Sequence, residues 1–91
     1  MARYTPSTGE WLEWKLPGSR PWAYAVYVDE RDVVWLSDFG ANAVLRFDPQ
    51  SGEFQAFQLP SNPGNVRQIL GRPGEVWLPE LAADQLVVIR Y

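Results

Sequence analysis

The sequence predicts an all-β protein built from a repeated unit of four short strands, and three observations support this. First, the segment Thr5–Pro17 (TPSTGEWLEWKLP) returns forty-three positions later as Asp48–Pro60 (DPQSGEFQAFQLP). Second, Gly and Pro, fifteen residues in all, separate β-prone segments about every ten residues. Third, no segment keeps a helical period. A period of about 42–45 residues with four strands is typical of a β-propeller blade, so two blades are predicted.

The first round of strands follows from local patterns. Glu10–Leu16 alternates apolar and polar residues after the turn at Pro6–Gly9, and Pro17 ends it. Ala23–Val28 is a nearly continuous β-prone apolar run, which predicts a strand covered on both faces. Further strands are predicted at Val33–Leu36, Ala43–Phe47 and Glu53–Leu59.

The second round repeats this order without its last strand. Val66–Leu70 is predicted to form the inner strand, with Arg67 directed towards the central channel. A turn at Gly71–Gly74 follows, and then strands at Glu75–Leu78 and Gln85–Tyr91.

The missing fourth strand is present at the other end of the chain, which predicts a circular permutation. Arg3 and Arg90 stand in the same place relative to the repeat and are 87 residues apart, the length of two blades. Residues 1–91 are therefore expected to form one unit. It comprises an outer strand (residues 3–17), a first blade (18–60) and three strands of a second blade (61–91). The outer strand is expected to complete the second blade of a neighbouring copy by strand exchange.

Two blades cannot close a propeller, because closed propellers have ~4–8 blades. The expected partner is therefore the chain itself. A homotrimer of six blades is favoured, and a tetramer of eight blades is the second choice. The apolar content, 46% of residues with thirteen aromatics, agrees with burial against other copies. The alternative is a fragment of a longer propeller, and whether such a piece is natural or engineered stays open.

Charge and composition exclude several classes of function. The net charge is −3 and no basic run occurs, so the electrostatic signature of nucleic-acid binding is missing. The chain has no Cys and no His, which removes disulfides, thiolate metal sites and the commonest general base. No segment is long or apolar enough for a transmembrane helix or a signal peptide, so no membrane role and a cytoplasmic location are expected.

The loops at one face of the predicted propeller hold most of the candidate site residues. Ligand-binding candidates are Arg20, Trp22 and Asn42 in these loops, and Arg67 on the predicted inner strand.

Asp38 and Glu80 follow Trp35 and Trp77 at the same spacing, so a closed ring would repeat these carboxylates near its axis. Carboxylate oxygens suit Mg²⁺ or another hard divalent cation. The alternative is that these acids accept hydrogen bonds from turn amides or pair with arginines such as Arg20 and Arg67.

Three segments resemble the C-terminal blades of the virginiamycin B lyase (streptogramin lyase) family. They are Gly18–Glu30 (GSRPWAYAVYVDE), Val34–Asp48 (VWLSDFGANAVLRFD) and Asn65–Trp77 (NVRQILGRPGEVW). The resemblance covers nearly the whole chain but about a third of such a protein, whose propeller has seven blades. It implies an enzyme that opens a cyclic depsipeptide lactone by elimination, using Mg²⁺, acidic ligands and a catalytic His.

This sequence departs from that pattern because it contains no His. The family's base is therefore missing, and no catalytic residue is assigned. The expected function is a self-assembling propeller fragment without catalytic activity, with ligand or cation binding at the axial loop face. The alternative is a metal-dependent enzyme resembling virginiamycin B lyase or a lactonase.

Overall fold

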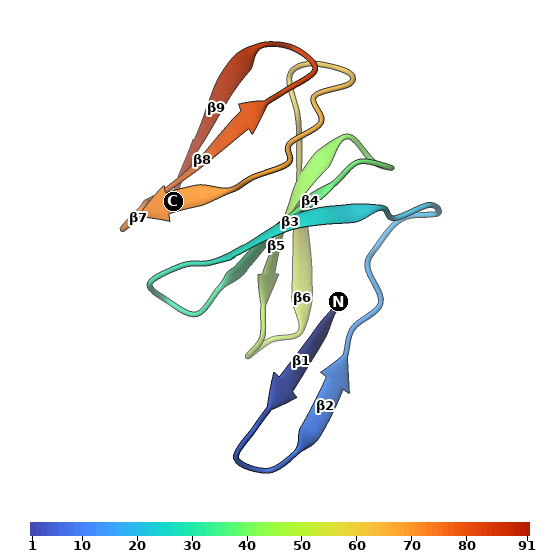
Figure 1. Cartoon of the computed structure of the whole chain (residues 1–91), viewed down its shortest axis with the longest axis vertical. Coiled ribbons are helices and arrows are strands. Elements are labelled where there is room, and N and C mark those ends of the chain that lie inside the picture. The colour runs from blue at the N-terminus through green and yellow to red at the C-terminus, as the bar shows by residue number, and fades with distance from the viewer.

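The computed structural model describes residues 1–91, and every regular element in it is a β-strand (Figure 1). The chain has no helix that is long and apolar enough to cross a membrane. The strands are β1 (Ala2–Thr5), β2 (Glu10–Glu13), β3 (Ala23–Val28), β4 (Val34–Asp38), β5 (Ala43–Asp48), β6 (Glu53–Gln58), β7 (Leu70–Arg72), β8 (Glu75–Glu80) and β9 (Gln85–Arg90).

Three antiparallel sheets contain these strands. β1 and β2 form the N-terminal hairpin, β3-β4-β5-β6 form the first sheet, and β7-β8-β9 form the second sheet. The first sheet lies between the other two (Figure 1). The hairpin contacts it through Trp14, whose ring centroid is 5.1 Å from that of Phe47. The all-β class is therefore confirmed, and four-stranded and three-stranded sheets follow each other as the repeat predicted.

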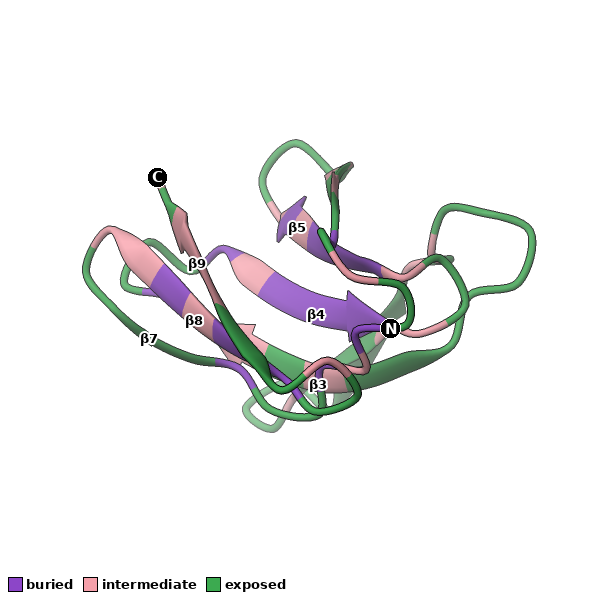
Figure 2. Cartoon of the chain, turned by 90° about the horizontal axis from the view of Figure 1, so that it is seen from above, coloured by how far each residue is buried: buried purple, intermediate pink, exposed green.

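The core lies between the first and second sheets, and Figure 2 shows burial concentrated in β4, β5 and β8. Trp35 is fully buried at its centre, with the rings of Phe57 and Tyr91 at 5.8 and 5.3 Å. The core cluster comprises Val33, Trp35, Val44, Leu59, Val66, Ile69, Val76 and Leu78.

Asp29 anchors this core at the β3–β4 turn. Its Oδ2 accepts a hydrogen bond from Trp35 Nε1 (2.9 Å), and its Oδ1 accepts bonds from the backbone N–H groups of Arg31 and Val33. Burial works to raise the pKa of Asp29, but the hydrogen bonds outweigh burial and hold that pKa below its ordinary value.

The predicted position of β3 is confirmed, but the expected cover on both faces is wrong for the single chain. Ala25 and Tyr27 face the second sheet and pack against the core. Val26 and Val28 are directed to the opposite side and are exposed. Side chains alternate between the faces of a strand, and only one face of this strand is covered by another sheet.

The predicted inner strand at Val66–Leu70 is also wrong. The observed strand β7 starts at Leu70, and Val66 makes only an isolated bridge to Glu80. The reason lies on β8. In the first sheet Ser37 Oγ accepts a hydrogen bond from Ala25 N (2.9 Å), whereas the second sheet has Pro79 in the place of Ser37. Proline has neither a side-chain acceptor nor a backbone donor, so this stretch cannot pair fully.

The equivalence of Arg3 and Arg90 is corrected by the registers. Trp35 pairs with Arg46 in the first sheet, and Trp77 pairs with Val88 in the second. Val88 therefore takes the place of Arg46, and Arg90 lies two residues farther along. Arg90 pairs with Glu75 instead.

Arg72 and Arg90 both donate hydrogen bonds to the carboxylate of Glu75. The bond from Arg72, and next the bond from Arg90, lower the pKa of Glu75 to about 2. These ion pairs hold the extended end of β9 against the β7–β8 turn.

Candidate functional site

Asp38 and Glu80 occupy equivalent places, as predicted. Each ends the second strand of its sheet, and each pairs with the first residue of the following strand, Ala43 or Gln85. Both side chains are buried. The sequence placed these acids correctly, but their surroundings differ.

Asp38 is bound by turn amides. Its Oδ1 accepts hydrogen bonds from the backbone N–H groups of Trp22 (2.8 Å), Gly40 (2.9 Å) and Ala41 (3.3 Å). This bears out the structural alternative for Asp38, although no ion pair with Arg20 accompanies it. Its second oxygen, Oδ2, is buried without a hydrogen-bond partner.

Glu80 has no partner at either carboxyl oxygen, although its side chain is only 1% exposed. Its carboxyl group lies against Gly64, where a Cβ atom would come within 3.3 Å of Oε2. Leaving a buried polar group without a hydrogen bond costs about 1–3 kcal/mol, and more for a charged group. Glu80 is therefore the polar group of this face that most needs a ligand.

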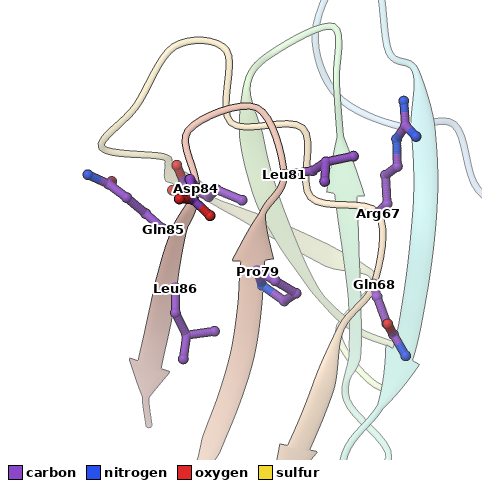
Figure 3. A pocket seen from close by; sticks show the side chains of 8 residues that line it. Arg67, Gln68, Pro79, Leu81, Asp84, Gln85 and Leu86 are labelled. Atoms are coloured by element: carbon purple, nitrogen blue, oxygen red, sulfur yellow. The ribbon is translucent and has the colours of Figure 1, made fainter.

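An open pocket of about 470 Å³ adjoins Glu80 (Figure 3). Arg67 and Gln68 lie on the segment that leads into β7, while Asp84 and Gln85 lie at the β8–β9 turn. Within this chain no three acidic side chains lie close enough together to share a metal ion. The lining residues are Arg67, Gln68, Pro79, Glu80, Leu81, Asp84, Gln85 and Leu86.

Arg67 does not face the acids of this pocket. Its guanidinium lies 6.0 Å from the ring centroid of Tyr24, on the first sheet. Because Val66 bridges Glu80 as Ala23 pairs with Asp38, Arg67 is the counterpart of Tyr24 and lies outside any regular strand. The predicted ion pairs of Arg67 with neighbouring acids are absent.

Trp22 lies in an aromatic cluster on the same loop face. It is 65% exposed and meets Phe39 edge-on at 5.6 Å. The ring of Tyr24 also packs against Phe39, with the two centroids 5.2 Å apart and the rings nearly parallel. Sequence reasoning missed Tyr24, although its spacing of two residues from Trp22 indicates a shared face. Arg20 is exposed beside this cluster and forms no ion pair.

Asn42 lies in the β4–β5 turn and binds the connection between β6 and β7. Its Nδ2 donates to the carbonyl of Ser61 (2.6 Å), and its Oδ1 accepts from the N–H of Gly64 (2.8 Å). Both ends of its side-chain amide are therefore used inside the chain.

Two apolar surfaces are left without a partner. The front face of the first sheet is its side towards the hairpin, and it exposes Val26 and Val28. The back face of the second sheet is its side away from the first sheet, and it exposes Leu70 and Leu86. Ten large hydrophobic side chains are exposed in all, a heavy load for 91 residues.

Residues at equivalent positions show that the two exposed surfaces correspond to the surfaces that meet between the first and second sheets. Leu70 pairs with Trp77 as Tyr27 pairs with Trp35, so Ile69 and Val26 correspond. Ile69 is 5% exposed against the first sheet, whereas Val26 is 63% exposed.

The back face of the second sheet differs in the same way from the side of the first sheet that meets the second sheet. Val44 opposite Ser37 is 0% exposed, and Leu86 opposite Pro79 is 57% exposed. Each side chain is buried where a second sheet covers it and exposed where none does.

A second cavity of about 500 Å³ separates the hairpin from the front face. Its walls include Trp14 on one side and Val26, Val34 and Phe47 on the other. The hairpin therefore covers only the outer part of the front face, and its inner part stays open.

Comparison with known proteins establishes the fold. No protein-family model matches the sequence, and no curated protein matches it. A catalytically inactive histidine-to-alanine variant of virginiamycin B lyase from Staphylococcus aureus, with quinupristin, is similar over 99% of this chain and 33% of that chain, with 22% identity and a TM-score of 0.83.

Two further structures agree. Selenomethionine-substituted virginiamycin B lyase from the same organism gives 23% identity and a TM-score of 0.66 over 76% of this chain and 26% of that chain. A streptogramin B lyase structure gives 17% identity and a TM-score of 0.77 over 98% and 33%. The resemblance is confirmed at the level of the fold, and the chain spans about a third of the length of these structures.

Proposed function

We propose that this chain is a self-assembling β-propeller unit, which closes a ring with copies of itself and for which a six-bladed homotrimer is favoured. The observation that carries the proposal is the unequal burial of equivalent residues. Val26 and Leu86 are exposed where their counterparts Ile69 and Val44 are buried between sheets. Neighbouring copies on either side would cover both surfaces with the kind of contact that already joins the two sheets.

The geometry of this contact favours a ring. The front face of one copy would meet the back face of the next, so each copy uses two different surfaces. Such heterologous contacts form rings when the rotation closes and fibres when it does not. Closed propellers have ~4–8 blades, which corresponds to two, three or four copies of this chain.

Strand exchange would complete the second sheet. β9 is an edge strand, and an edge strand presents unpaired backbone N–H and C=O groups to any strand of suitable shape. β2 corresponds to β6, since Trp11 and Phe54 pair with equivalent residues of the preceding strands. β2 of one copy would therefore pair with β9 of its neighbour as β6 pairs with β5.

Light scattering on a sizing column tests the proposal. We expect a single species of about 31 kDa, three times the 10.4 kDa of one chain. A species of about 42 kDa would replace the trimer by an eight-bladed tetramer. A folded 10.4 kDa monomer at all concentrations would contradict self-assembly.

The proposed assembly lacks the activity of virginiamycin B lyase. The similar Staphylococcus aureus structure is that of a catalytically inactive variant in which a histidine is replaced by alanine. This chain has no histidine at any position. It therefore has no side chain to take that role.

A hard cation at the axial loop face is a second proposal, and the unpartnered oxygens of Glu80 support it. A hard cation such as Mg²⁺ needs about six oxygen ligands, so copies around the axis or bound water would have to complete its shell. Calorimetric titration of MgCl₂ into the assembled protein should release or absorb heat, and Glu80→Gln should abolish the signal. The absence of heat in the unsubstituted protein would rule out the cation.

A further inference from the structure

β1 stands in the place of a third strand of a blade. Tyr4 pairs with Trp11 in the hairpin as Phe47 pairs with Phe54 in the first sheet. The pair Ala2 and Glu13 likewise corresponds to Leu45 and Ala56. β1 therefore presents to β2 the edge that β5 presents to β6.

In the second sheet this place belongs to β9. Leu36 pairs with Leu45, and Leu78 pairs with Val87, so Val87 is the counterpart of Leu45. Ala2 of one copy and Val87 of a neighbour would consequently compete for the same position opposite Glu13. The competition follows from the registers of four separate strand pairs.

β2 cannot pair with β1 and with a neighbour's β9 at the same time. β1 and a neighbour's β9 would run in the same direction and use the same edge of β2. If β1 stayed between them, it would move β2 outwards by one strand spacing, about 4.8 Å. Trp14 would then lose its present contact with Phe47 on the first sheet.

We infer that β1 is an internal substitute for the neighbour's β9 and must leave β2 before the ring closes. This inference rests on the proposed self-assembly. Exchange replaces the four residue pairs of the hairpin by as many as six, the number that joins β5 to β6. It also places Glu10 opposite Arg90, in the register of Glu53 and Asp48, and opposite charges across a strand pair are favourable.

Disulfide trapping tests the inference cleanly, because the chain contains no cysteine. Met1 and Trp14 exchange backbone hydrogen bonds, so the next pair, Ala2 and Glu13, is of the non-hydrogen-bonded type. The Cα atoms of such a pair are about 4.5 Å apart, which a disulfide can span. The double variant Ala2→Cys with Glu13→Cys would therefore lock β1 onto β2 in the presence of an oxidant.

We expect the oxidised lock to run as a 10.4 kDa monomer and the reduced form to assemble like the unsubstituted protein. A matched variant, Glu13→Cys with Val87→Cys, should instead give disulfides between copies, visible as a ladder on a non-reducing gel. If the oxidised lock assembles as fully as the reduced form, β1 stays on β2 in the ring and the inference is wrong. If the unsubstituted protein is itself monomeric, the proposed self-assembly fails together with the inference.

Discussion

Val26→Glu is expected to convert the assembled protein into a 10.4 kDa monomer, and Leu86→Glu is expected to do the same from the other side. Both side chains are more than half exposed in the single chain, so the fold of the monomer should change little. In the assembly each glutamate would be buried in an apolar contact without a partner, which costs several kcal/mol per contact. A loss of that size weakens association by at least about a hundredfold.

A mixture of the two variants gives the sharper result. The Val26→Glu chain keeps an intact back face, and the Leu86→Glu chain keeps an intact front face. One sound contact therefore remains between unlike chains, and we expect a heterodimer of about 21 kDa, twice 10.4 kDa.

Gln55→Glu, an exposed position on β6, adds the same charge away from both faces and should leave the assembly intact. Full-size rings formed by Val26→Glu alone or by Leu86→Glu alone would show that the front and back faces do not form the contact between copies.

Trp35→Ala is expected to lower the free energy of unfolding by about 3–5 kcal/mol, the usual cost of truncating a large aromatic residue in a core. Trp35 is fully buried between the two sheets and contacts Phe57 and Tyr91. A loss of this size approaches the whole stability of a small domain, which is about 5–15 kcal/mol. Urea titration followed by circular dichroism would measure it, and an unchanged midpoint would contradict the position of Trp35 in the core.

Trp35→Phe separates packing from hydrogen bonding. It keeps an aromatic ring but removes the Nε1–H donor to Asp29, so a smaller loss of about 1–2 kcal/mol is expected. The pKa of Asp29 is lowered in the folded state, so its contribution to stability is present above the ordinary value of 3.8 and is lost as the pH falls. Without the Trp35 donor this pKa should rise, and the fall in stability below pH 4 should become shallower.

The repeat allowed the sheets to be predicted because each strand of the first sheet lies in a β-prone segment between turn residues. Ala23–Val28 was placed correctly from its β-prone run, and the turn acids Asp38 and Glu80 from their distance to tryptophan. The inner strand at Val66–Leu70 was wrong because a single distant residue, Pro79, removes its hydrogen-bond partners. The loss of these hydrogen bonds is caused by a residue on the neighbouring strand, so the local sequence of the inner strand does not reveal it.

The surroundings of the candidate site were harder to predict than its residues. Asn42 was singled out as a ligand-binding residue, but both ends of its amide bind the connection between β6 and β7. The isolation of Glu80 depends on its distance from every donor of the folded chain, and sequence spacing contains no such information. Arg3 and Arg90 are each followed by a tyrosine, and this shared Arg-Tyr pair suggested that they are equivalent. The equivalence failed because only strand pairing determines the register.

The difference between Ser37 and Pro79 also limits the symmetry of any ring built from this chain. β3 has six residues and β7 only three, so long and short inner strands would alternate around the axis. The shape of the opening along the ring axis would then repeat once per chain and not once per sheet. A molecule that fits it would have to match the number of copies, so axial ligands of different rotational symmetry would discriminate between a three-chain and a four-chain ring.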